Sequence, residues 1–197
     1  QWSNGEGIIF KKQIELDDKY LFKVTQQVQN NTSNQIELYP YAQITRNKIP
    51  DDIQNFYISH EGFIGVFDDE LKEDDYDDIE EKKIVREANE GWLGITDKYW
   101  MAALVPKKGE NFKSTFLYKN AFKANYILNN PTIINSSSNN SNEVKVFVAA
   151  KEVETIDSYA SDEKISKFDL VIDWGWFYFF TKPLFFIIDY LFKYSGN

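Results

Sequence analysis

Cysteine is absent from the 197-residue sequence, and histidine and methionine each occur once. Without cysteine, the chain has no disulfide bond, no thiol nucleophile and no cysteine-ligated zinc or iron–sulfur centre. The single histidine, His60, leaves no ordinary transition-metal site, so we expect neither a metal nor a cofactor. Cysteine-free chains occur in the periplasm as well as in the cytosol, and this absence therefore does not fix the compartment.

Positive charge is scarce as well. Lysine and arginine together number 22 against 31 aspartate and glutamate residues, which gives a net charge of −9. Proteins that bind nucleic acid displace counterions with a basic surface, so this acidic balance argues against a nucleic-acid partner. Hydrophobic residues make up 43% of the chain and charged residues 27%, which excludes a polytopic membrane protein and a disordered chain.

Motifs of common enzyme families are missing. The sequence has no G-x-S-x-G nucleophile elbow, no P-loop and no G-x-G-x-x-G fingerprint. His60 has no evident partner that would activate it as a base, and 31 acidic residues make any carboxylate pair uninformative. We therefore expect no catalytic residue and a structural role for His60.

Strand patterns dominate the first 150 residues, where apolar and polar residues alternate between short polar turns. Pro40 should place its strand at an edge or divide it, because proline cannot donate a backbone hydrogen bond. The pattern predicts an all-β protein, an antiparallel sandwich or barrel. The predicted strands cover residues 8–16, 20–28, 36–44, 91–105, 112–118, 121–128 and 143–150, with strand-like character again at 168–172.

An acidic run occupies residues 68–81 (DDELKEDDYDDIEE), in which Lys72 is the one basic residue. A calcium-binding loop is one interpretation, but the spacing differs from an EF-hand and the required glycine is missing. Blocks of like charge are usually solvated. We therefore predict a solvated acidic loop between strands.

A short helix is predicted over residues 151–162, where Val153, Ile156 and Tyr159 follow one another at a spacing of three. The most apolar stretch comes later, at 174–194. A membrane span needs about 20 mostly apolar residues, and Thr181, Lys182 and Pro183 interrupt this one. Thr181 instead fits a helix N-cap and Pro183 the first helical turn.

This C-terminal segment is amphipathic when drawn as a helix at about 100° per residue. The opposite face carries Asp189, Tyr190 and Lys193, with Phe186 among them. Trp174, Trp176 and Tyr178 precede the helix, and such rings favour the headgroup level of a bilayer. The pattern leaves two possibilities open, contact with a membrane surface or packing on the chain's own core. The apolar face comprises Leu184, Phe185, Ile187, Ile188, Leu191 and Phe192.

Two blocks carry a resemblance to a known family. Residues 91–106 (GWLGITDKYWMAALVP) and 169–184 (DLVIDWGWFYFFTKPL) resemble segments of the YidC family of bacterial membrane protein insertases. Residues 2–7 and 20–31 also look like periplasmic strands of that family. Glu90 departs from the pattern, because the family often has a glycine there.

The resemblance implies the periplasmic domain of an inner-membrane insertase, a large supersandwich similar to sugar mutarotases. It implies two parts, a β-sandwich at 1–173 that lacks its N-terminal portion, and a membrane-surface helix at 174–197 that leads to a transmembrane bundle. It further implies a non-enzymatic module on the periplasmic face of the inner membrane, which would assist insertion and folding of membrane proteins. Its implied partners are Sec translocon components, nascent membrane proteins and the membrane surface.

Two other functions stay open on the residues alone. A carbohydrate-binding or epimerase-like domain would need exposed aromatic rings such as Trp92 and Trp100 to stack on sugars, although likeness of fold is a weak guide to function. A secreted adhesin is the third possibility, and the unusual C-terminal helix argues against it.

Overall fold

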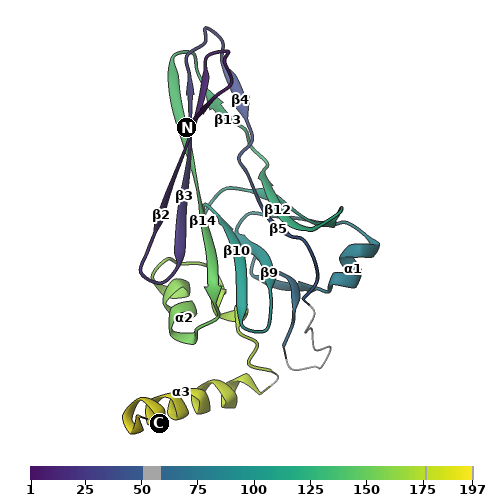
Figure 1. Ribbon diagram of the computed structural model, residues 1–197, viewed down its shortest axis with the longest axis vertical. Coiled ribbons are helices and arrows are strands. Elements are labelled where there is room, and N and C mark those ends of the chain that lie inside the picture. The colour runs from purple at the N-terminus through teal and green to yellow at the C-terminus, as the bar shows by residue number, and fades with distance from the viewer. Residues whose placement is uncertain (51–58, 176, 197) are drawn as a thin grey trace.

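The computed structural model describes residues 1–50, 59–175 and 177–196, and antiparallel sheets make up most of it. The largest sheet has eight strands in the order β1-β2-β3-β14-β10-β9-β6-β7 (Figure 1). The strands are β1 (Trp2–Ser3), β2 (Ile8–Leu16), β3 (Leu21–Asn30), β6 (Gly62–Phe67), β7 (Glu70–Asp74), β9 (Gly91–Thr96), β10 (Trp100–Pro106) and β14 (Ser138–Ala150).

A second sheet packs across the lower part of the first, in the order β5-β12-β11-β8, and β4 and β13 form a separate pair. The long strands β2, β3 and β14 continue beyond this second sheet to the end of the molecule opposite the C-terminal helix (Figure 1). The strands of the smaller sheets are β4 (Ile36–Leu38), β5 (Tyr41–Arg46), β8 (Ile84–Ala88), β11 (Phe112–Tyr118), β12 (Phe122–Leu128) and β13 (Thr132–Ile134).

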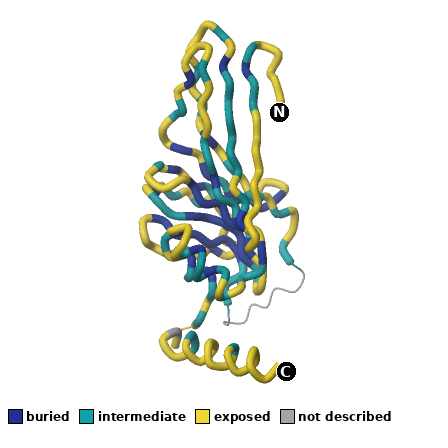
Figure 2. Tube along the Cα trace, turned by 90° about the vertical axis from the view of Figure 1, so that its left-hand side faces the viewer, coloured by how far each residue is buried: buried dark blue, intermediate teal, exposed yellow. Residues whose placement is uncertain are grey.

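Aromatic side chains fill the space between the two main sheets. The Phe63 ring lies 4.9 Å from that of Phe116, and the Tyr76 ring lies 4.8 Å from that of Phe122 in an edge-to-face arrangement. All four residues are buried, and the burial is concentrated in the half of the molecule where the sheets overlap (Figure 2). Edge-to-face pairs add about 0.5–1.5 kcal/mol each to the stability that burial supplies.

The opposite face of the large sheet is also covered, by α2 (Val153–Ser161) and the 3-10 turn η1 (Phe168–Val171). Trp92 and Phe147 of the sheet pack here against Phe168, with ring centroids 5.4 Å apart in both pairs. The indole Nε1 of Trp92 donates a hydrogen bond to the Ser166 carbonyl at 3.0 Å. Because central strands are buried on both faces, β6 reads as an unbroken apolar run (GFIGVF) instead of alternating.

The predicted fold class, an antiparallel β-sandwich with few helices, is confirmed. Pro40 divides the predicted strand at 36–44 into β4 and β5, and its carbonyl accepts a hydrogen bond from the Leu128 amide at 3.0 Å. The helix predicted at 151–162 is α2, whose Ile156 and Tyr159 are buried against the sheet.

The expected strand at 168–172 is wrong, because these residues form η1. Lys167 has a left-handed backbone (φ 51°), which turns the chain immediately before this segment. Phe168 and Val171 are then buried together. A spacing of three brings two side chains to one side of a helical turn, whereas in a strand it would place them on opposite faces.

The acidic run at 68–81 is not a loop. It contains β7 and a short helix, α1 (Tyr76–Glu81), because Tyr76 and Ile79 are anchored in the core between the sheets. Burial raises the pKa of Tyr76 to about 12. Asp74, from the same run, accepts two hydrogen bonds from the Arg86 guanidinium, at 2.7 and 2.8 Å.

The Asp74–Arg86 pair is mostly shielded from solvent, with side chains 10% and 21% exposed. Removing one partner leaves the other charge partly buried without compensation, which typically costs about 3–5 kcal/mol. We therefore expect Asp74→Ala to lower the free energy of unfolding by about that amount. Urea denaturation followed by tryptophan fluorescence measures the change.

The matched control is Glu70→Ala, which removes another carboxylate of β7 from an exposed pair with Lys72. Exposed ion pairs contribute little to stability. Equal destabilisation by the two variants would contradict the role assigned to Asp74.

Candidate membrane-facing surface

The C-terminal helix α3 (Tyr178–Ser195) lies at one end of the molecule, below α2 and apart from the β-sandwich (Figure 1). It begins three residues before the predicted N-cap, Thr181. The Thr181 hydroxyl does not cap the helix, because it donates backward to the Trp174 carbonyl at 2.8 Å. Pro183 consequently lies within the helix and not in its first turn, which removes one backbone donor there.

The polar side of α3 faces α2. Lys182 Nζ lies 3.0 Å from Asp157 Oδ1, and Lys193 Nζ lies 2.5 Å from Glu154 Oε1. Asp189, one turn before Lys193, is 2.9 Å from the same ammonium group. Hydrogen bonds to Asp189 and Glu154 raise the pKa of Lys193, which keeps this lysine charged.

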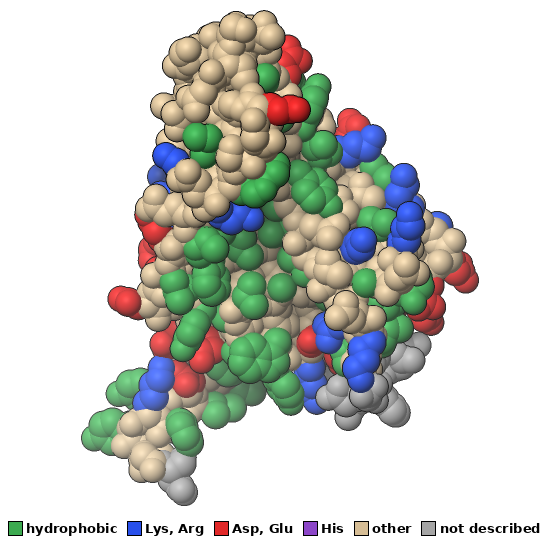
Figure 3. Space-filling model, turned by 45° about the horizontal axis from the view of Figure 1, so that its top comes forward, with side chains coloured by type: hydrophobic (Ala, Val, Ile, Leu, Met, Phe, Trp, Pro, Cys, Tyr) green, Lys and Arg blue, Asp and Glu red, His purple; other side chains and the backbone are tan. Residues whose placement is uncertain are grey.

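The apolar side of α3 is largely exposed, although Trp174 packs on Phe185. Phe185 is 38% exposed and Leu191 is 58% exposed, and neither belongs to a buried core cluster. In the space-filling view, hydrophobic side chains stand out from the helix at the lower left (Figure 3). The large hydrophobic residues of this face that are more than a third exposed are Leu184, Phe185, Ile187, Ile188, Leu191 and Phe192.

The structure extends the predicted apolar face by one turn. Phe180 is 65% exposed and precedes Leu184 by four residues, so the two share a face. The face predicted from sequence omits Phe180 because it considers residues 184–194 alone. A helical wheel drawn from residue 178 onward would have included it.

Trp174 is tied to the start of this helix. Its ring lies 5.5 Å from that of Phe185, edge to face, and 5.8 Å from Lys182 Nζ. Of the other predicted rings, Trp176 lies outside the described residues, and Tyr178 is described only as the first residue of α3. None of the described helices combines the length and apolar character needed to cross a bilayer.

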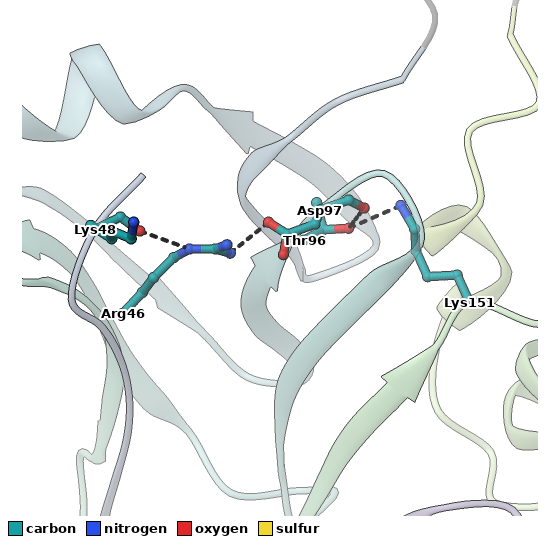
Figure 4. A network of polar contacts seen from close by, with 5 residues as sticks. All are labelled: Arg46, Lys48, Thr96, Asp97 and Lys151. Atoms are coloured by element: carbon teal, nitrogen blue, oxygen red, sulfur yellow. Dashed lines mark hydrogen bonds and ion pairs between the residues drawn. The ribbon is translucent and has the colours of Figure 1, made fainter. Parts of the chain in front are cut away.

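A polar network fixes the β9–β10 turn at the same end of the molecule (Figure 4). Arg46 Nη1 donates to Asp97 Oδ1 at 2.5 Å, and Lys151 Nζ donates to Thr96 Oγ1 at 3.1 Å. Burial lowers the pKa of Lys151, while Glu61 and Asp97 oppose that shift. The network joins β5, the β9–β10 turn and the segment before α2.

His60 contacts a backbone carbonyl and a carboxylate. Its Nε2 lies 2.9 Å from the Phe63 carbonyl and its Nδ1 lies 3.5 Å from Asp75 Oδ1. Within the described ranges, no cluster of histidine and acidic residues is arranged to hold a metal ion. Trp92 cannot stack on a sugar, because it is fully buried, whereas Trp100 is 62% exposed.

The ion pairs to α2 predict how α3 can be released. Glu154→Lys together with Asp157→Lys should repel Lys193 and Lys182 and detach the helix, while the buried face of α2 is unchanged. Hydrogen exchange of the α3 amides should become faster, and exchange in the β-strands should stay the same.

The control reverses both signs. Adding Lys182→Glu and Lys193→Glu to the α2 variant recreates two opposite-charge pairs, so slow exchange in α3 should return. If exchange in α3 is unchanged by the first variant, the ion pairs do not hold this helix.

Comparisons with known proteins identify the family of the chain. The membrane protein insertase YidC of Pelagibacter ubique is 50% identical over 196 residues, and that of Brucella melitensis 38% identical over 202. Both matches cover 100% of this chain, and the chain spans about a third of those relatives, 35% and 33%. A crystal structure of a galactose mutarotase related enzyme from Lactobacillus acidophilus is 11% identical, with a TM-score of 0.49, over 74% of this chain and 64% of that one. The family model of the YidC periplasmic domain matches residues 1–187, and the chain therefore belongs to the YidC family as its periplasmic domain.

Proposed function

We propose that this chain acts as the periplasmic part of a membrane protein insertase and contacts the inner membrane through α3. The name of the matching domain family supports the periplasmic location, and the names of the relatives support the insertase role. The observation that carries the membrane contact is the exposed apolar face of α3, whose polar side is paired with α2.

The proposal divides the chain into a β-sandwich at 1–173 and a membrane-surface helix at 174–197. Packing supports this boundary, because Val171 is the last residue of the buried clusters and Ile172 packs against them. Beyond it, the described large side chains of α3 are exposed.

Energetics favour adsorption on a bilayer. A large apolar side chain gains roughly 1.5–3 kcal/mol when it is fully buried, and a half-submerged helix gains about half of that per residue. The helix is already formed in the structure, so little conformational entropy is lost when it binds. The free energy gained by immersing four of its side chains therefore exceeds this cost. These side chains are Leu184, Ile187, Ile188 and Leu191. The net charge of −9 opposes binding to anionic lipid. Because apolar contacts then supply the binding free energy, binding to uncharged phosphatidylcholine should be weak, reversible and largely insensitive to salt.

The partners proposed for the whole insertase are nascent membrane proteins and components of the Sec translocon. We also propose that this chain is not an enzyme. Its one histidine contacts a neighbouring carbonyl and Asp75, and that arrangement supports a structural role. The carbohydrate alternative has less support, because only Trp100 of its two proposed stacking rings is exposed.

Vesicle flotation tests the membrane contact. The full chain should float with phosphatidylcholine vesicles, and Leu184→Asp with Leu191→Asp should abolish flotation, because both charges would enter the apolar region. A shortened chain that ends at Asp173 should also stay at the bottom of the gradient. Circular dichroism checks that the β-sandwich remains folded in each variant.

Asn139→Asp with Ser141→Asp is the matched control, since it adds the same charge at two exposed positions of β14. This variant should float like the unmodified chain. If the full chain does not float, or the shortened chain floats equally well, α3 is not the membrane contact.

A further inference from the structure

A second pair of exposed rings lies at the same end of the molecule as α3. Tyr99 is 65% exposed and lies in the β9–β10 turn, and Trp100, the first residue of β10, is 62% exposed. The turn lies at the lower end of the large sheet, whereas the N-terminus lies in the upper part of the molecule (Figures 1 and 2).

Backbone and side-chain contacts hold this turn in place. The Asp97 amide donates to the Trp100 carbonyl and the Lys151 amide to the Tyr99 carbonyl, both at 2.8 Å. Arg46 binds the Asp97 carboxylate (Figure 4). The two rings are therefore exposed on a hairpin whose backbone is held by hydrogen bonds. Little conformational entropy would be lost when they contact a partner.

The direction of α3 relates the turn to a bilayer. The Lys151 amide is hydrogen-bonded to Tyr99 of the turn, and Lys151 lies two residues before α2 in the sequence. Helix α2 in turn faces the polar side of α3. The apolar side of α3 therefore points away from the sandwich. The β9–β10 turn lies at the end of the sandwich that is nearest α3 (Figure 1), so a bilayer that contacts this side would lie beyond that end of the molecule.

The chemistry of the turn fits the headgroup region of that bilayer. Tyrosine and tryptophan each combine an apolar ring with a polar edge and are enriched at membrane–water interfaces. Lys98 lies between the turn residues, with its Nζ 5.2 Å from the Tyr99 ring centroid. A lysine beside an interfacial ring can keep its ammonium group in water or near phosphate.

We propose that Tyr99 and Trp100 enter the headgroup layer of the same bilayer that α3 contacts and form a second membrane contact. This inference rests on the proposed membrane role of α3. Two contacts on different elements would fix the tilt of the sandwich relative to the membrane. With α3 as the single contact, the domain could still rotate about the axis of that helix.

The absence of cysteine permits a direct depth measurement, because a single introduced thiol is unique. Lys98→Cys places an environment-sensitive fluorophore beside both rings without removing them. Ile188→Cys reports on α3, and Ser3→Cys is the matched control beside Trp2, which is also 62% exposed. With phosphatidylcholine vesicles, the labels at 98 and 188 should shift to the blue and be quenched by nitroxide lipids, and the label at 3 should not.

The second arm measures affinity. Tyr99→Ser with Trp100→Ser should weaken binding to vesicles about tenfold, as expected for the loss of two partly immersed rings. Trp2→Ser with Tyr39→Ser removes one tryptophan and one tyrosine that are exposed elsewhere and should leave the affinity unchanged. Thermal unfolding checks that both variants are folded.

The outcomes separate the two proposals. Quenching at 188 without quenching at 98, or unchanged affinity of the Tyr99 and Trp100 variant, overturns the second contact and leaves the role of α3 intact. Quenching at 98 that persists in Leu184→Asp with Leu191→Asp supports the turn and contradicts the role of α3. Absence of quenching at both positions overturns both proposals.

Discussion

Two ion pairs determine which way α3 faces. Lys182 and Lys193 lie on one side of the helix and bind Asp157 and Glu154, which lie on one side of α2. Because the charged side of α3 is turned toward the domain, its apolar side remains largely exposed in the described part of the structure. An exposed apolar face of this size is typical of an interaction surface, and its proposed membrane role depends on this orientation.

Helix α2, which carries the acidic partners of these ion pairs, is held in position by the core. Ile156 is fully buried under α2, and the Tyr159 hydroxyl donates to Asp17 at 2.8 Å, so α2 is joined both to the large sheet and to the β2–β3 turn. Burial raises the pKa of Tyr159, and the hydrogen bond to Asp17 raises it further. The sheet beneath is itself packed on its other face against the second sheet. The position of α3 is thereby set by the packing of residues far from it in sequence.

Local patterns predicted much of this arrangement. The strand at 112–118 and the apolar side of α3 follow directly from the periods of two and 3.6 residues. The acidic run at 68–81 could not be interpreted locally, because its structure depends on the pairing of Asp74 with Arg86 and on the burial of Tyr76. The partners of α3 were likewise invisible in sequence, since nothing local relates Lys182 to Asp157. The resemblance to the family supplied the domain's identity, which periodicity alone did not.

A nitroxide scan of α3 on vesicles tests the orientation of this helix most directly. A single cysteine would be placed in turn at each position from 179 to 194, and the accessibility of each label to oxygen and to a water-soluble relaxant would be compared. If α3 lies on the bilayer by its apolar side, accessibility should vary with a period of about 3.6 residues, with Leu184, Ile188 and Leu191 deepest and Lys182 and Lys193 shallowest. Uniform accessibility along the helix, or a deepest position on the lysine side, would contradict it.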